Sequence, residues 1–210
     1  YADIFHFPWL KYLVDAPSRG SDYLLQLTFK PNRQLEIYSR YKSETKLSND
    51  TDDFQVISPV IPGKRKNWRT QVNYKLSRHL TYRNRIELSW FNKSAGLPSR
   101  GFLANVDLLY KPLLKPFSAN IRLQFFQTDD YNSRLYAYEN DVLFSNSIPV
   151  FSDKGYRYYA NLNYDISRKL SAWLRLAQTI YTGKETIGSG LDEISGNRKT
   201  EVKVQLMYQW

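Results

Sequence analysis

The sequence contains no cysteine, and it has no long hydrophobic run. Without a thiol the chain can form no disulfide, thiolate nucleophile or thiolate metal site. A membrane-spanning helix needs about 20 consecutive apolar residues, and no segment provides them. The negative mean hydropathy still leaves one membrane architecture open, because a strand of a transmembrane barrel needs only about 9–11 residues with every second one apolar.

Aromatic residues and positive charge are both abundant. Seventeen Tyr, 11 Phe and 5 Trp make up 16% of the chain, and these residue types favour β-strands and membrane–water interfaces. The 30 Lys and Arg outweigh the 20 Asp and Glu, which gives a net charge of +10. Such a balance indicates anionic surroundings, such as lipid phosphates, nucleic acid or an acidic partner, and does not choose among them.

Apolar and polar residues alternate through most of the chain, which is typical of strands with two different faces. The last segment shows this most clearly, because Val202, Val204, Leu206, Tyr208 and Trp210 fall on one face. The pattern predicts eight further strands, at 23–29, 35–41, 68–76, 80–90, 102–110, 117–125, 156–166 and 170–177. Residues 1–20 are expected to form an extracellular loop or an incomplete strand, since their prolines lack the backbone donor that pairing needs.

The connections between these strands alternate between short and long. The short ones are predicted at 31–33, 77–79, 111–116 and 167–169, and the long ones at 46–66, 92–100, 128–154 and 183–197. Outer-membrane barrels have short periplasmic turns and long external loops. A soluble all-β protein is the alternative, but it would not require this alternation.

We therefore predict an all-β fold in which residues 21–210 supply about 9–10 strands of an antiparallel transmembrane β-barrel. A sheet that faces lipid must close, because every backbone donor and acceptor has to pair within the protein. Bacterial barrels of this kind have an even number of strands. The chain is thus expected to be the C-terminal part of a larger barrel, with missing strands upstream and residues 201–210 as its closing strand.

The polar face of the predicted strands carries charges of both signs. On the lipid face, Arg or Lys would cost about 2–4 kcal/mol at mid-bilayer, so these side chains are expected to line the lumen. The predicted lining residues are Arg69, Lys75, Arg83, Arg85, Glu87, Asp107, Arg122, Arg157, Asp165 and Arg175. They are compatible with an anion-selective pore, but we favour cross-strand ion pairs that solvate the barrel interior.

Four loop segments carry more specific motifs, namely Phe7 to Leu10, Asp15 to Gly20, Thr128 to Leu143, and Ile187 to Asp192 followed by Gly196-Asn197. These motifs resemble the C-terminal barrel region of Bacteroidota envelope proteins that contain a helix-hairpin-helix domain. The resemblance implies the outer membrane of a Gram-negative bacterium, a periplasmic region upstream and no catalytic residues. Any DNA binding would belong to that upstream region, so no nucleic-acid partner is expected here.

The last strand also resembles an outer-membrane assembly signal, in which an alternating strand ends in an aromatic residue. Val204, Leu206, Tyr208 and Trp210 match it, with Trp in place of the usual Phe. This implies the barrel assembly machinery, outer-membrane lipid and lipopolysaccharide as partners, together with other envelope proteins. Two basic segments, at 64–66 and 198–199, are predicted at the outer rim, where lipopolysaccharide phosphates would lie.

Residues suited to catalysis or metal binding are few. Neither of the two histidines, His6 and His79, lies beside a plausible nucleophile. Oxygen ligands for a hard cation are offered by two acidic clusters, Asp129, Asp130, Glu139 and Asp141, and Asp50, Asp52 and Asp53. Because such loop clusters are more often solvated, we predict no metal, no cofactor and no catalytic residue.

The expected function is that of a non-enzymatic outer-membrane barrel, acting as an anchor or as a component of an envelope assembly. Two alternatives belong to other classes. One is a diffusion pore or transporter, and the other is a barrel-embedded hydrolase that would depend on its histidines.

Overall fold

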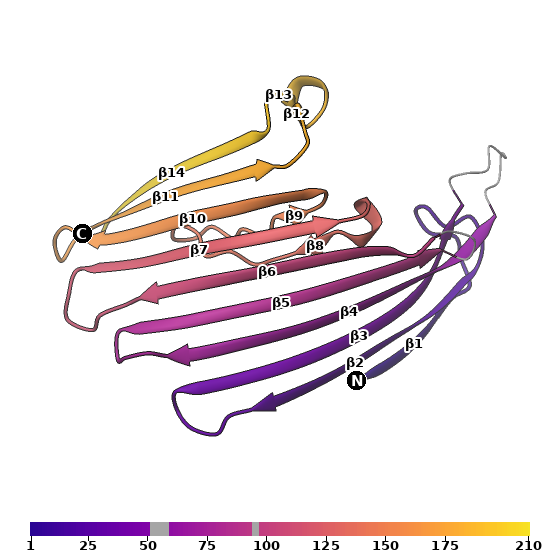
Figure 1. Cartoon of the computed structure of the whole chain (residues 1–210), viewed down its shortest axis with the longest axis horizontal. Helices are drawn as coiled ribbons and strands as arrows, with labels where there is room; N and C mark the ends of the chain where they lie inside the picture. Colours follow the sequence, from indigo (N-terminus) through magenta and orange to yellow (C-terminus); the bar gives the residue numbers. More distant parts are fainter. Residues whose placement is uncertain (51–58, 94–96) are drawn as a thin grey trace.

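The computed structural model describes residues 1–50, 59–93 and 97–210, and its main feature is one ten-stranded sheet. Neighbouring strands pair antiparallel in chain order (Figure 1). The strands are β1 (Ala2–Phe7), β2 (Ser18–Phe29), β3 (Leu35–Asn49), β4 (Val60–Lys75), β5 (Leu80–Lys93), β6 (Ser99–Tyr110), β7 (Phe117–Thr128), β10 (Lys154–Asp165), β11 (Leu170–Tyr181) and β14 (Arg198–Tyr208). The predicted antiparallel all-β fold is confirmed, and β1 and β14 are the two edges of the sheet.

The two last connections contain small elements of their own. Between β7 and β10 lie η1 (Tyr131–Ser133), β8 (Leu135–Tyr136) and β9 (Val150–Phe151), and between β11 and β14 lie β12 (Thr186–Ile187), η2 (Gly190–Asp192) and β13 (Ile194–Ser195). The two η segments are single 3-10 turns. Within the described residues, no helix has the length and apolar character to cross a membrane.

Tight connections gather at one end of the sheet, which we call the turn end. Two of them share one design: the hydroxyl of Ser77 accepts hydrogen bonds from the backbone N–H groups of His79 and Leu80, and Ser167 does the same for the corresponding positions. Such side-chain to backbone bonds favour turns over regular structure. All four predicted short connections lie at this end.

The connections that the sequence predicts to be long lie at the opposite end, which we call the loop end. There β3 and β4 extend further than the sequence indicates, since their ladder continues to the pair Asn49 and Val60. Similarly, β5 runs to Lys93 and β6 begins at Ser99. Strands thus occupy part of the predicted loops 46–66 and 92–100, whose residues 51–58 and 94–96 lie outside the described residues.

The first residues of the chain form a short strand, β1, whose six residues are half the number in β2. Every residue of β1 pairs with β2, from Ala2 opposite Tyr23 to Phe7 opposite Ser18. Pro8 follows β1 and Pro17 precedes β2, so neither proline has to donate to the ladder. The expected obstacle to a tenth strand therefore falls in the connection between β1 and β2.

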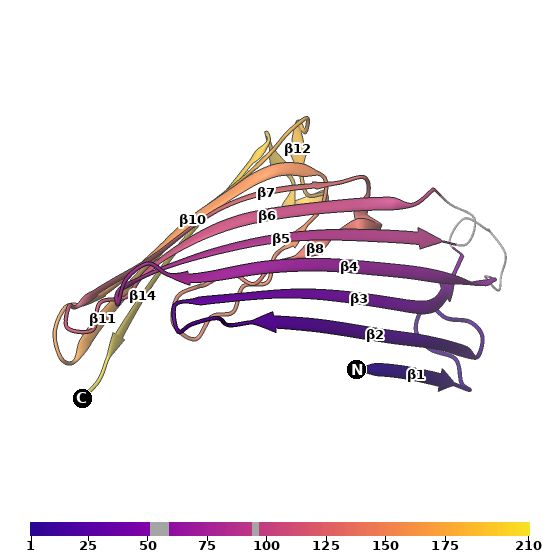
Figure 2. The same cartoon turned by 60° about the horizontal axis from the view of Figure 1, so that its bottom comes forward.

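The sheet is curved (Figure 2) and its two faces differ. On the face that we call the covered face, the connection between β7 and β10 packs against the strands. The opposite face, called the bare face, carries the alternating apolar residues, and many are exposed, such as Leu25 at 63%, Leu123 at 63% and Val204 at 69%. A sheet with one polar and one apolar face gives the alternation seen in the sequence.

Aromatic residues form two bands on the bare face, one near each end of the sheet. In four central strands the two band members are eight positions apart, namely Tyr82 and Trp90, Phe102 and Tyr110, Phe117 and Phe125, and Tyr156 and Tyr164. Rings within a band touch, as Phe125 lies 6.0 Å from Phe102 and 5.2 Å from Tyr156 between centroids. Between the bands the residues of this face are mainly aliphatic.

Candidate functional site

The connection between β7 and β10 folds back along the covered face and is the most elaborate feature of the molecule. Its segment 135–139 is extended, with Leu135, Ala137 and Glu139 buried against the sheet and the alternate residues Tyr136 and Tyr138 about half exposed. Because successive side chains of an extended chain point to opposite sides, one side of this segment faces the sheet and the other faces away.

Arginines from four strands hold this connection by its backbone carbonyls. The donor and acceptor pairs are Arg65 and Asn132 (2.8 Å), Arg85 and Tyr136 (2.8 Å), Arg122 and Tyr138 (2.6 Å), and Arg175 and Asn140. The arginines belong to β4, β5, β7 and β11, so the connection crosses most of the sheet. Hydrogen bonds from a charged donor are the stronger kind.

Two carboxylates of the connection complete the contact with charged partners. Glu139 accepts from Arg157 at 2.8 and 3.0 Å and also pairs with Arg175, and all three side chains are at most 3% exposed. Asp141 accepts from Lys203 Nζ at 2.6 Å and lies 3.7 Å from Arg175 Nε. The arginines of β10 and β11 therefore find their acids in the connection, not in a neighbouring strand.

Two further ion pairs do run between neighbouring strands. Asp107 lies directly opposite Arg122 in the register and accepts two hydrogen bonds from it, at 2.5 and 2.8 Å. Arg69 and Glu87 are also directly opposite and paired at 2.8 and 3.1 Å. Directly opposed charges of unlike sign stabilise a sheet.

An apolar cluster anchors the connection near the loop end. Leu103 and Phe126 of the sheet pack with Leu135, Ala137 and Phe151 of the connection, and all five are at most 2% exposed. Leu103 and Phe126 lie on the otherwise polar covered face. Their burial supplies the hydrophobic part of the docking.

Hydrogen bonds occupy the acidic residues that the sequence offers as cation ligands. Asp130 caps η1 by accepting from the N–H groups of Asn132 and Ser133. Burial alone would raise the pKa of the Asp130 carboxyl, but these bonds and the one from Ser99 hold it below its usual value. For Asp141, burial is likewise outweighed by the bond from Lys203, which lowers the pKa.

The carboxylates of the first acidic cluster are therefore engaged with separate partners. Within the described residues, no group of three or more His, Cys, Asp or Glu side chains has the arrangement of a metal site. Asp52 and Asp53, from the second predicted cluster, lie outside the described residues.

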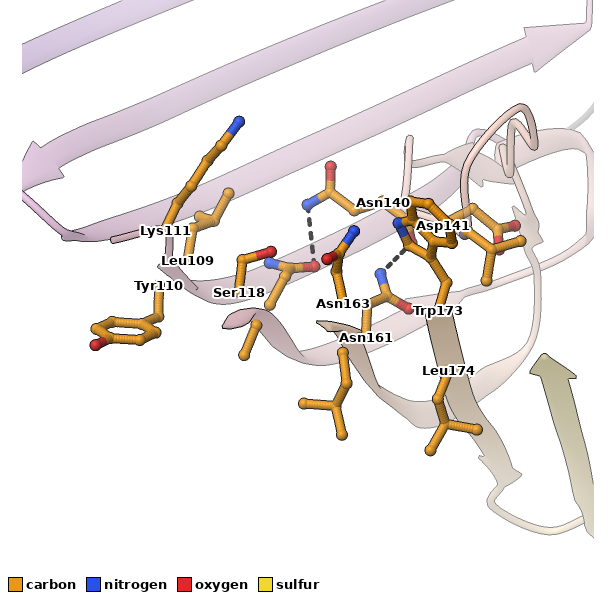
Figure 3. Close-up of a pocket in the computed structure, with 14 residues that line it drawn as sticks. Leu109, Tyr110, Lys111, Ser118, Asn140, Asp141, Asn161, Asn163, Trp173 and Leu174 are labelled. Atoms are coloured by element: carbon orange, nitrogen blue, oxygen red, sulfur yellow. Dashed lines mark hydrogen bonds between the residues drawn. The ribbon is translucent and has the colours of Figure 1, made fainter. Parts of the chain in front are cut away.

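Beneath the connection lies a cavity of about 330 Å³ (Figure 3). Asparagine side chains dominate its polar lining, and Trp173 adds an indole ring. Asn140 of the connection donates to Asn120 at 3.0 Å, and Asn161 donates to the Asn140 carbonyl at 2.7 Å. The cavity is thus bounded by both the docked connection and the strands of the sheet.

A second, smaller cavity of about 170 Å³ lies on the covered face of the sheet near β3 and β4. Its lining is strongly basic and comprises Arg40, Lys42, Arg65, Arg69 and Arg134, with Glu87 as the acid. Arg40 stands directly opposite Arg69 in the register. Directly opposed like charges destabilise a sheet, and the pairing of Arg69 with Glu87 offsets part of that repulsion.

The residues predicted to lie on the polar side all fall on the covered face, but they form two groups. Those near the loop end and the middle contact the connection or one another. Lys75 and Asp165 are exposed at the turn end, where Asp165 accepts from Ser171 at 2.7 Å. The set is therefore not one continuous site.

Val204, Leu206, Tyr208 and Trp210 are all strongly exposed at the edge of the sheet, between 61% and 101%. The first three lie on the bare face of β14, and Trp210 follows the end of the strand. The two histidines lie far from each other in the register. His6 pairs with Arg19 at the loop end, whereas His79 lies in the turn between β4 and β5.

The docking of the connection is the main feature that the sequence analysis missed. Two signals were present in the sequence. Residues 135–138 are a run of Leu, Tyr, Ala and Tyr inside a predicted loop, and Leu103 and Phe126 are apolar residues at polar positions of the alternation. Both indicate that something covers this part of the sheet.

Comparisons with known proteins give no further guidance, since no family model, no curated protein and no solved structure matches the chain.

Proposed function

We propose that this chain forms part of the wall of an outer-membrane β-barrel, and that the barrel is a non-enzymatic anchor or component of an envelope assembly. The two aromatic bands on the bare face carry the proposal. Eight positions of a strand span roughly 26 Å, or about 20 Å along the axis of a barrel whose strands tilt by roughly 40°. That height is close to the apolar band of about 25 Å, flanked by aromatic girdles, of outer-membrane barrels.

The two edges of the sheet fit a barrel that is completed by further strands. In a bilayer, unpaired backbone groups of β1 and β14 would each cost several kcal/mol. Strands upstream of Tyr1 are the proposed partners of these edges, in keeping with the resemblance to the C-terminal barrel region of Bacteroidota helix-hairpin-helix proteins. The exposed residues of β14 are the proposed signal for the assembly machinery.

The docked connection supports a structural role over a catalytic one. Inside the proposed barrel it would fill part of the lumen, and its buried carboxylates are already paired, Glu139 with Arg157 and Arg175 and Asp141 with Lys203. A hydrolase that uses both histidines is not supported, because His6 and His79 lie at opposite ends of the sheet.

The proposal predicts which face contacts lipid. Because the chain has no cysteine, single cysteines at Ile121, Leu174 and Val204 can carry a fluorescent label, with Asn163 as the covered-face control. In lipid vesicles that contain the full chain, quenchers attached to the lipid acyl chains are expected to quench the labels at Ile121, Leu174 and Val204. Aqueous iodide is expected to quench only the label at Asn163. Iodide quenching of all four alike would contradict the proposal.

An anion-selective pore is the second candidate, favoured by the basic cavity around Arg40 and Arg69. Planar-bilayer recording separates the two functions. A filled barrel should give no steady current, whereas a pore should conduct anions over cations and lose part of that preference in Arg40→Gln. Lys75→Gln, on the same face at the turn end, is the matched control for the loss of one charge.

A further inference from the structure

Charges on the bare face of the sheet follow a simple rule of sign and position. Where the ten strands are described, every charged residue of this face other than histidine is basic and lies toward the loop end, namely Arg19, Lys64, Lys66, Arg100, Lys154 and Arg198. The carboxylates of these strands all lie on the covered face, as shown by Asp22, Glu87 and Asp107 in the register.

The basic residues begin where the aromatic band at the loop end stops. Lys66 is directly opposite Trp90, and Trp68, two positions nearer the middle, is directly opposite Tyr41. Lys64 lies two positions further out. Since a strand rises about 3.3 Å per residue, both amines lie within roughly 15 Å of the aromatic band.

A cleft of about 540 Å³ brings these features together. Its lining consists of Tyr41, Lys64, Lys66, Trp90, Phe91, Asn92 and Pro98. Arg65, between the two lysines, turns to the covered face and donates to Asn132. The predicted basic segment 64–66 is thus divided between the two faces of the sheet, and only Lys64 and Lys66 face the cleft. Arg100 does not line this cleft.

We propose that Lys64 and Lys66 bind the phosphate of a phosphorylated glycolipid of the lipid A type, with its acyl chains lying along the aliphatic belt of the bare face. This inference rests on the proposed function. Two ammonium groups with an amide beside them match the charge and acceptors of a phosphate ester. The aromatic rings below them suit the boundary between headgroup and acyl chains, which a free phosphate or a nucleic acid does not possess.

Native mass spectrometry of the full chain in detergent micelles, titrated with diphosphorylated lipid A, tests the assignment. Each basic residue near an anionic surface strengthens binding roughly fivefold, so K64Q/K66Q is expected to bind about 20-fold more weakly. K64R/K66R should keep most of the affinity. The control K75Q/K111Q removes the same charge at the turn end and should stay within about twofold of the parent protein.

Two further arms identify the source of the phosphate. Lipid A without its phosphates should bind the parent protein as weakly as lipid A binds K64Q/K66Q, and inorganic phosphate at equal concentration should not displace lipid A. Equal binding of both lipids, unchanged binding by K64Q/K66Q, or displacement by inorganic phosphate would each overturn the assignment. If one of these results is obtained while the fluorescent label at Ile121 contacts lipid, only the lipid A inference fails. If that label is in water, the proposed function itself is refuted.

Discussion

Replacing Glu139 by alanine is expected to release the connection between β7 and β10 from the covered face. The substitution leaves the buried side chains of Arg157 and Arg175 without their main acid. Breaking a buried ion pair from one side costs about 3–5 kcal/mol, because the remaining charge is uncompensated. Hydrogen exchange of the amides in 135–141 measures the opening, and it should accelerate by roughly two to four orders of magnitude.

Each arginine keeps one more distant acid, Arg157 with Glu201 at 3.4 Å and Arg175 with Asp141 at 3.7 Å. Because Asp141 already accepts from Lys203, more of this cost should come from Arg175. The double variant E139A/R175M also removes the charge of Arg175. Its loss in free energy of unfolding is expected to be smaller than the sum of the losses in the two single variants. Glu36→Ala is the matched control, because Glu36 is 37% exposed and pairs with Lys30 on the same face. Its loss should cost under about 1 kcal/mol, and an equal effect of both Glu→Ala variants would refute the assignment.

Features with a short sequence range could be predicted well. The alternation of period two places each strand residue on one of two faces, and a change of register by one residue would invert them all. The turns at Ser77 and Ser167 depend on bonds to residues two and three positions ahead. For these reasons the antiparallel all-β fold and the short connections could be derived without a structure.

The docked connection depends on contacts that no local pattern specifies. Glu139 meets Arg157 and Arg175, which are 18 and 36 positions away, and an acidic residue in a predicted loop is ordinarily solvated. Strand limits at the loop end were also missed, because β3 and β4 extend through mutual pairing. In the sequence, the prolines near β1 and β2 argue against regular strand pairing. A proline disfavours a strand only where its missing N–H would have to donate, and these prolines lie just outside the two strands.

An arginine in place of Ile121 is expected to reveal whether the bare face contacts lipid. Ile121 lies midway between Phe117 and Phe125 on β7, is 49% exposed, and is directly opposite Leu108 and Ala160. At mid-bilayer the substitution should lower the free energy of unfolding by about 2–4 kcal/mol. In water the same half-exposed position should tolerate arginine at a cost of about 0.5 kcal/mol.

Urea titration of the full chain refolded into lipid vesicles measures this difference, with Asn163→Arg as the matched control. Asn163 lies at the asparagine cavity on the covered face, where an added arginine can remain hydrated in a wet lumen. A large loss for Ile121→Arg with a small one for Asn163→Arg is the result expected of a barrel wall. The reverse order would mean that the face with two aromatic bands lies in water, where an arginine at the middle of the aliphatic belt costs little.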